Sequence, residues 1–271
     1  MTGCNNSNGS GMTNTRRAIV FLAWGPDFIA EVGDCIRGSS LPPYPRILIT
    51  DTSSVVDLDG IDVIRADFRL EGLARKAEMI DFLPAEYDSF LFLDSDTRVL
   101  QDLSLGFEKA EAHGIAASPA PHYCLDHFWG FGDVIDREGM ERLGRMQYNT
   151  GVLFFSMTDV VAEVFERWRD LSVRYSAESH SDQPYFTLAM EQLGFNPYTL
   201  SPSYNLRGFG ELISGPVRVW HSHEPLPPDL NAGANAWPPR RVHGSTIIPP
   251  QEERPPQGSA VRRVLRKLRP R

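Results

Sequence analysis

The sequence has only three cysteines among its 271 residues, Cys4, Cys35 and Cys124. Their wide spacing and odd number argue against a disulfide framework or a cysteine-rich zinc site and indicate reduced thiols. The chain also lacks an apolar run long enough to span a bilayer, and its first residues lack the basic-then-apolar layout of a signal peptide. Together these absences predict a cytoplasmic protein.

Basic residues are scarce outside the C-terminal end. The net charge is −8, yet residues 261–271 carry six positive charges and no acidic residue. Without them, 21 basic residues stand against 35 acidic ones, which argues against DNA or RNA as the main ligand. The apolar residues of 259–271 follow helical spacing. Two interpretations therefore stay open: a basic amphipathic helix in peripheral contact with the inner face of the membrane, or a disordered cationic tail.

The middle of the chain alternates between strand and helix patterns. At 41% hydrophobic residues it can bury a large core. Residues 1–15 read as a disordered N-terminus, 16–223 as one domain, and 224–258 as a proline-rich extension. The alternation predicts an α/β fold with a Rossmann-like, mostly parallel sheet flanked by helices. We expect strands at 18–23, 46–50, 62–65, 90–93, 115–117, 151–155 and 217–220, helices at 26–37, 71–83, 133–144, 159–173 and 182–193, and an aromatic loop at 119–132.

The most informative stretch is 90–98, FLFLDSDTR. Its apolar residues predict a strand buried on both faces, and Asp94 and Asp96 follow where open α/β sheets bind ligands. Two nearby carboxylates repel each other unless a cation lies between them, so the motif predicts a Mn²⁺ or Mg²⁺ site. The two side chains can converge only if the chain turns at Thr97 and Arg98. The simpler interpretation is a strand end with two solvated aspartates.

Further polar motifs follow predicted strands or begin helices. Taken singly, each has an ordinary explanation as a turn, a helix cap or surface charge. They are Arg75 and Lys76 on helix 71–83, Asn149 before strand 151–155, Asp182 and Gln183 at a helix start, and His221 and His223 after the last strand.

In their order along the chain, these motifs resemble glycosyltransferases of the GT-A fold, most closely glycosyltransferase family 8 and its bacterial relatives. The resemblance rests on LFLDSDT, YNTGVLFF, DQP, SYNL and VWHSH and covers residues 17–223. It implies a metal-dependent hexosyltransferase that moves a sugar from a nucleotide-diphosphate donor, a UDP-sugar by family, with retention of configuration. The implied acceptor is the hydroxyl of a glycan, a lipid-linked sugar or a small molecule.

The resemblance also implies roles for individual residues. The metal ligands would be Asp94, Asp96 and His221. Donor-binding residues would be Ala23, Trp24, Phe28, Ser95 and Asn205, with Phe28 offering a ring for the base. Catalytic residues would be Arg75, Asn149, Asp182 and Gln183, with Arg75 bracing the metal aspartates. One departure is clear, because no lysine follows His221 where the family places one on the diphosphate; Arg207, Arg218 or Lys76 would have to replace it.

Two other functions also fit part of the sequence. A phosphatase of the haloacid dehalogenase type would use Asp94 as nucleophile and Asp96 as acid/base, but it needs a later acidic pair. Only Asp133 and Asp136 are available for that pair, and no apolar strand precedes them. A domain that binds sugar nucleotides without catalysis is the non-enzymatic alternative.

Overall fold

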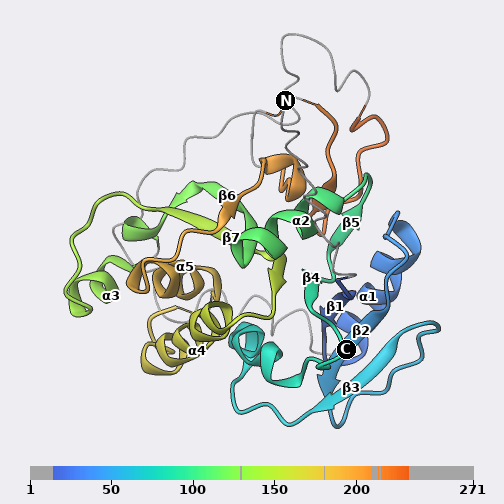
Figure 1. Ribbon diagram of the computed structural model, residues 1–271, viewed down its shortest axis with the longest axis horizontal. Helices are drawn as coiled ribbons and strands as arrows, with labels where there is room; N and C mark the ends of the chain where they lie inside the picture. The colour runs from blue at the N-terminus through green and yellow to red at the C-terminus, as the bar shows by residue number, and fades with distance from the viewer. Residues whose placement is uncertain (1–14, 129, 180, 209–212, 214, 232–271) are drawn as a thin grey trace, which may run out of the picture.

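The computed structural model describes residues 15–128, 130–179, 181–208, 213 and 215–231. Its centre is a seven-stranded sheet with the strand order β3-β2-β1-β4-β7-β6-β8 (Figure 1). The strands β1, β2, β3 and β4 are mutually parallel, as a Rossmann-like alternation requires. Their bounds are Arg17–Leu22 for β1, Arg46–Asp51 for β2, Asp62–Ala66 for β3 and Ser89–Leu93 for β4, and α1 spans Pro26–Gly38.

The second half of the sheet mixes both directions. The strand β7 runs antiparallel to β4 and to β6, and the short β8 is parallel to β6. The remaining helices are α2, α3, α4 and α5, with short 3₁₀ turns η2 and η3. The strands of this half span Ile115–Cys124 (β6), Met146–Ser156 (β7) and Tyr198–Thr199 (β8). The helices and turns span Ser104–His113 (α2), Gly132–Arg137 (α3), Asp159–Arg174 (α4), Gln183–Gln192 (α5), Leu125–His127 (η2) and Pro202–Tyr204 (η3).

A separate two-stranded sheet lies beyond the end of β4. It pairs β5 (Thr97–Val99) with β9 (Val219–His221) in antiparallel fashion, with Thr97 opposite His221. Because β5 begins three residues after Asp94, this pairing brings the aspartate motif and the C-terminal histidine to the same edge of the main sheet. Two segments more than a hundred residues apart in sequence are thus held side by side.

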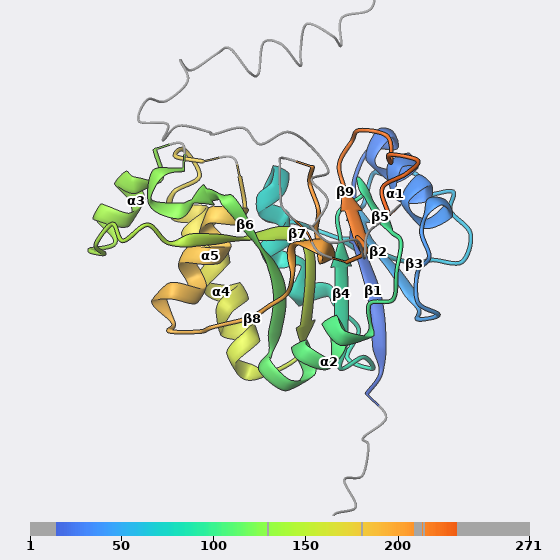
Figure 2. The same ribbon diagram turned by 90° about the horizontal axis from the view of Figure 1, so that it is seen from above.

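The central strand β4 is buried on both faces, as its sequence predicts. Phe90 and Phe92 join the apolar cluster under α4 and α5, and Leu91 and Leu93 join the cluster under α1 and α2. Figure 2 shows α4 and α5 on the opposite side of the molecule from α1. Alternate residues of one strand therefore serve two cores, which explains why the strand has no polar face.

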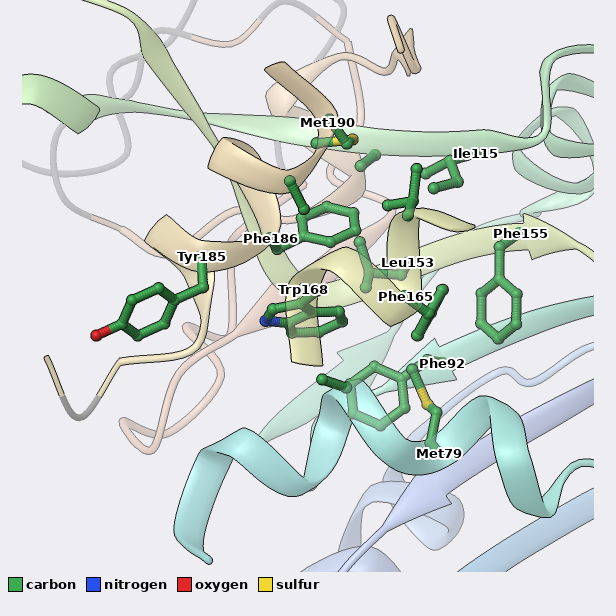
Figure 3. Close-up of a cluster of buried hydrophobic side chains, with 14 of the residues drawn as sticks. Met79, Phe92, Ile115, Leu153, Phe155, Phe165, Trp168, Tyr185, Phe186 and Met190 are labelled. Carbon is green, nitrogen blue, oxygen red and sulfur yellow. The ribbon is translucent and has the colours of Figure 1, made fainter. Parts of the chain in front are cut away.

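Trp168 of α4 connects the larger core to the site described below. Its fully buried ring lies beside Phe165 and Phe186, at centroid distances of 5.4 and 4.9 Å (Figure 3). Its indole Nε1 donates a 3.1 Å hydrogen bond to the carbonyl oxygen of Asp182. The packing that stabilises the core also holds the start of α5 in place.

Several expected boundaries differ in the structure. Residues 72–82 form a 3₁₀ helix, η1, instead of an α-helix; within it Ala77 is buried and Leu73 is 47% exposed. The helix expected at 133–144 ends at Arg137. The aromatic segment expected as a loop begins as strand, because β6 continues to Cys124 alongside the long β7.

Three predicted segments lie mostly or wholly outside the described residues: the N-terminus 1–15, of which only Thr15 is described, the extension beyond residue 231, and the basic tail 259–271. The part of the extension that is described, 224–231, contains turns and no helix or strand. Among the described residues, no helix combines the length and apolar character that crossing a bilayer requires.

Candidate active site

Asp94, Asp96 and His221 converge at the C-terminal end of β4. The Nε2 atom of His221 lies 3.2 Å from Asp96 Oδ1 and 3.7 Å from Asp94 Oδ2. One ligand atom from each residue falls within 4.8 Å of the others. Two carboxylates and an imidazole at these separations can hold a divalent cation such as Mn²⁺.

A tight turn lets the two aspartates converge. The backbone N–H and the hydroxyl of Thr97 both donate to the carbonyl oxygen of Asp94, at 3.2 and 2.7 Å. The turn expected around Thr97 therefore begins at Asp94, and Thr97 already belongs to β5. The hydroxyl of Ser95, between the two aspartates, donates to Glu31 of α1 at 2.5 Å.

Two asparagines orient the ring of His221. Asn205 donates its Nδ2 to Asn149 Oδ1 at 2.7 Å, so its own Oδ1 faces the Nδ1 of His221, also at 2.7 Å. An amide oxygen accepts there, which assigns the proton of a neutral ring to Nδ1 and leaves the Nε2 lone pair facing the carboxylates. Asn149 Oδ1 is itself held by the backbone N–H of Gly151 at 2.8 Å. This chain of hydrogen bonds fixes the orientation of the His221 ring, with Nε2 toward Asp94 and Asp96.

Gly151 lies directly against the side chains of His221 and Asp94. A Cβ atom there would lie 2.1 Å from His221 Cε1 and 2.7 Å from Asp94 Oδ2. The glycine before the apolar part of β7 is thus required for space, because any side chain would push the histidine or the aspartate aside.

Lys76 is a buried cation beside the site. Its ammonium lies 2.7 Å from Asp94 Oδ1 and 3.4 Å from Asp182 Oδ2. Burial acts to lower the pKa of Lys76, but the carboxylates of Asp182 and Asp94 outweigh burial and hold that pKa above its usual value. The ammonium of Lys76 thus meets two carboxylates, those of Asp94 and Asp182, and the Asp96 carboxylate lies beyond its reach. The excess negative charge favours a further cation.

The electrostatics of Asp96 also favour a cation. Burial acts to raise its pKa, but when the ring of His221 carries a second proton, on Nε2, its hydrogen bond and positive charge outweigh burial and lower the pKa of Asp96 to about 2. Asp96 is thus ionised at neutral pH. Burial is the main cause that raises the pKa of Asp94 above its ordinary value, and the carboxylates of Asp182 and Asp96 act in the same direction.

Arg75 does not make the contact that the resemblance implies. Its guanidinium stacks on the rings of Trp24 and Phe68, 4.5 and 4.9 Å from their centroids, and its Nε donates to the Leu70 carbonyl oxygen. The only described carboxylate paired with it is Asp51, at 3.9 Å. The neighbouring Lys76 is the cation that reaches the aspartates, since η1 turns the two side chains to different sides.

A cavity of about 310 Å³ opens beside the three ligands. Trp24 and Phe28 form an aromatic wall with ring centroids 6.3 Å apart, and Phe28 is 51% exposed. Asn205 lies behind His221 and does not line the cavity. It therefore orients the histidine ring through its hydrogen bond and does not face a molecule bound in the cavity. The expected residues that do line it are Ala23, Trp24, Phe28, Asp94, Ser95, Asp96, Asn149, Asp182, Gln183 and His221.

Two further residues named from the sequence, His223 and Arg207, also line this cavity. His223 lines the cavity, with Nδ1 2.9 Å from Glu31 and Nε2 3.6 Å from Asp96. Arg207 lines it too, whereas Arg218 donates to the Asp102 carbonyl oxygen. The sequence offered a signal for His223, which follows His221 by two residues, but none for Glu31, whose helix position looks like ordinary surface charge.

The acidic pair that a phosphatase would need is engaged elsewhere. Asp133 and Asp136 lie on α3 and both pair with Arg142, at 3.4 and 2.5 Å. Neither lines the cavity that contains Asp94. Among the described residues of the cavity, no second acidic pair replaces them.

No family model matches this chain, and no curated protein matches it in sequence. Solved structures do match. The galactosyltransferase LgtC, in complex with donor and acceptor sugar analogs, superposes with a TM-score of 0.55 at 15% identity, over 80% of this chain and 92% of LgtC. Mouse xyloside xylosyltransferase 1 superposes with a TM-score of 0.53 at 12% identity, over 78% of this chain and 99% of that one.

The chain has the GT-A fold. Its mostly parallel sheet flanked by helices is the architecture of these glycosyltransferases, and the predicted fold class is confirmed. At such low identity the likeness concerns the fold alone. The GT-A fold nevertheless gives the Asp94–Asp96–His221 cluster its context, because the cluster lies at the C-terminal end of a central strand, where α/β sheets bind ligands.

Proposed function

We propose that this protein is a metal-dependent glycosyltransferase that moves a sugar from a nucleotide-diphosphate donor, a UDP-sugar, to an acceptor hydroxyl. The observation that carries the proposal is the convergence of Asp94, Asp96 and His221 at the edge of a GT-A sheet. The same cluster on another fold would indicate a metal site without indicating its use.

The residues present fit a divalent cation. Two carboxylates supply hard oxygen ligands, and an imidazole held by Asn205 through Nδ1 supplies a nitrogen, a combination that Mn²⁺ accepts. Asp94, Asp96 and His221 would hold the ion. When bound, it would stabilise the charge that develops on a leaving diphosphate more strongly in the transition state than in the ground state.

The donor would lie in the 310 Å³ cavity. Its base would contact the aromatic wall of Trp24 and Phe28, beside Ala23, and its sugar would approach Asn149. Arg207, which lines the cavity next to the β9 edge, is the residue that we assign to the diphosphate in place of the missing lysine. Arg218 does not line the cavity, and Lys76 is engaged with Asp94 and Asp182.

Transfer breaks the bond between the anomeric carbon and the diphosphate oxygen and forms a bond from that carbon to the acceptor oxygen, whose proton is released. The nucleoside diphosphate leaves with the bonding electrons. Asp182 and Gln183 would lie at the reacting face, where a carboxylate stabilises positive charge on the sugar. Lys76 holds Asp182, and Gln183 donates to Gln147 at 3.0 Å. Retention of configuration, implied by the resemblance, belongs to the same proposal.

A thermal-shift titration with UDP, in the presence and absence of Mn²⁺, tests the proposal. We expect UDP to raise the melting temperature only with Mn²⁺, since binding to the folded state adds about 2.7 kcal/mol at a hundred times Kd. Asp96→Asn should abolish the shift, whereas Asp133→Asn, in an exposed ion pair outside the cavity, should leave it intact. UDP binding that is independent of Mn²⁺ and of Asp96 would contradict the metal-dependent donor site.

A further inference from the structure

A second cavity adjoins the first on the far side of Asp182. It has a volume of about 580 Å³ and lies between residues 69–74 and the end of α4 with the loop that follows it. Leu73, Ser181 and Asp182 line both cavities. We call this space the serine pocket. A ligand in the serine pocket would lie next to the proposed donor, at the residues that line both cavities.

The lining of the serine pocket combines hydroxyl groups with exposed apolar side chains. Ser176, Ser179 and Ser181 line it from the α4–α5 loop. Leu73 and Val173 line it from opposite elements and are 47% and 57% exposed, so their apolar surfaces are available to a ligand. Hydroxyl groups can donate and accept, and aliphatic side chains suit the C–H face of a sugar ring. This mixture matches a polyhydroxylated ligand.

The charge of the serine pocket disfavours an anionic ligand. Arg69 is the only cationic residue among its described lining residues, and its guanidinium already binds Glu78 and Asp81, each at 2.8 Å. Glu71 and Asp182 add negative charge to the lining. A phosphate would meet two carboxylates and an arginine that is already engaged, so the pocket favours a neutral ligand.

Tyr185 preorganises the loop that carries the serines. Its hydroxyl donates to the carbonyl oxygen of Tyr175 at 2.5 Å and accepts from the backbone N–H of Ser179 at 3.1 Å. Figure 3 shows this hydroxyl pointing away from the aromatic cluster in which Trp168 lies. The loop is therefore tied to the core at the point where it borders the pocket, which reduces the ordering that binding would require.

We propose that the serine pocket binds the acceptor, a neutral glycoside, and presents its nucleophilic hydroxyl to the reacting carbon beside Asp182. The assignment of the acceptor role rests on the proposed glycosyltransferase function. Asp182 is well placed for this task, since Trp168 holds its backbone oxygen and Lys76 holds its carboxylate. The occupied pocket would lie on one side of that carboxylate and the donor cavity on the other.

The test uses two matched valine variants of α4. Val173→Lys places a long cationic side chain in the serine pocket. Val160→Lys makes the same change at a residue that is 42% exposed and lines neither cavity. The probes are methyl glucoside, methyl galactoside, methyl mannoside and inorganic phosphate. Their binding is measured by ligand-observed NMR in the presence of Mn²⁺ and UDP, and the Kd of UDP is measured in parallel.

We expect at least one methyl glycoside to bind the wild-type protein and Val160→Lys equally, and Val173→Lys to weaken it at least tenfold. UDP should bind all three proteins with the same Kd. If no glycoside binds, if phosphate binds more tightly than the glycosides, or if the two variants behave alike, the assignment of the pocket is wrong. Failure of UDP to bind with Mn²⁺ would instead contradict the proposed function, while glycoside binding sensitive to Val173→Lys would still establish the pocket.

Discussion

Gly151→Ala adds a single methyl group at the centre of the candidate metal site. The new Cβ would lie 2.1 Å from His221 Cε1, whereas ordinary contact begins near 3.4 Å. The ring would have to move by roughly 1.3 Å, enough to disrupt its 2.7 Å hydrogen bond to Asn205. The backbone of Gly151 is not in the left-handed region, so the effect is steric and not conformational.

The magnitude follows from what the hydrogen-bond partners of a metal ligand do for metal affinity. Disturbing the partners that orient a metal ligand lowers metal affinity about 10- to 100-fold, or about 1.4 to 2.7 kcal/mol. Overpacking should also reduce the free energy of unfolding by about 1–3 kcal/mol. The assay is a Mn²⁺ titration by electron paramagnetic resonance in the presence of UDP, with urea unfolding measured on the same samples.

Gly194→Ala is the matched control. Gly194 has open space around it but a φ of +62°, so alanine there is strained and should cost about 1 kcal/mol of stability without touching the site. We expect both variants to lose stability and only Gly151→Ala to lose Mn²⁺ affinity. A Gly151→Ala protein that binds Mn²⁺ within twofold of wild type would refute the assignment of His221 and Asp94 as ligands.

Three other perturbations probe the surroundings of the site. Lys76→Met should reduce the stability of the metal-free protein by about 3–5 kcal/mol, because it leaves the buried carboxylate of Asp182 and the partly buried carboxylate of Asp94 uncompensated. Urea unfolding checks this, and a change below about 1 kcal/mol would show that the Lys76–Asp182 pair does not behave as a buried ion pair. Burial raises the pKa of Tyr185 to about 12, so the unfolded chain releases this proton first and stability should fall between pH 10 and 12, by about 2–3 kcal/mol in full. In Tyr185→Phe the free energy of unfolding should fall less steeply over this pH range, because one fewer proton is released on unfolding. An unchanged slope would exclude Tyr185 as the source of the fall. Trp168→Phe removes the hydrogen bond to the Asp182 backbone, and we expect kcat to fall more than KM rises; equal stability and kinetics would argue against an anchoring role.

Much of the architecture was predictable because it depends on local patterns. The strands β1, β2, β3 and β4 lie where apolar runs predict them, and α1, α4 and α5 agree within about two residues. The strand β7 contains the predicted run 151–155 but begins five residues earlier, at Met146. The prediction was wrong where local preference and tertiary context disagree. Residues 72–82 have helical spacing, but they adopt 3₁₀ geometry, with Glu78 bonded to the backbone N–H groups of Arg69 and Leu70.

The metal ligands could be proposed from sequence because carboxylates after an apolar strand are a local signal. The choice between Arg75 and Lys76 could not, since two adjacent cations look alike in a sequence. Only the path of η1 places one beside Trp24 and the other beside Asp94. The position of Asn205 behind His221, and not in the cavity, likewise depends on a fold that joins residues distant in sequence.

By itself, the sequence determined the order of the strands along the chain, the burial of β4 on both faces and the carboxylates at its end. These properties follow from the spacing of apolar and polar residues within short segments. The tertiary structure alone decided which residues meet. The pairing of β5 with β9 carries His221 to the aspartates, and Gly151 leaves room for that meeting. The serine pocket also belongs to the tertiary structure, because its walls come from segments that are a hundred residues apart.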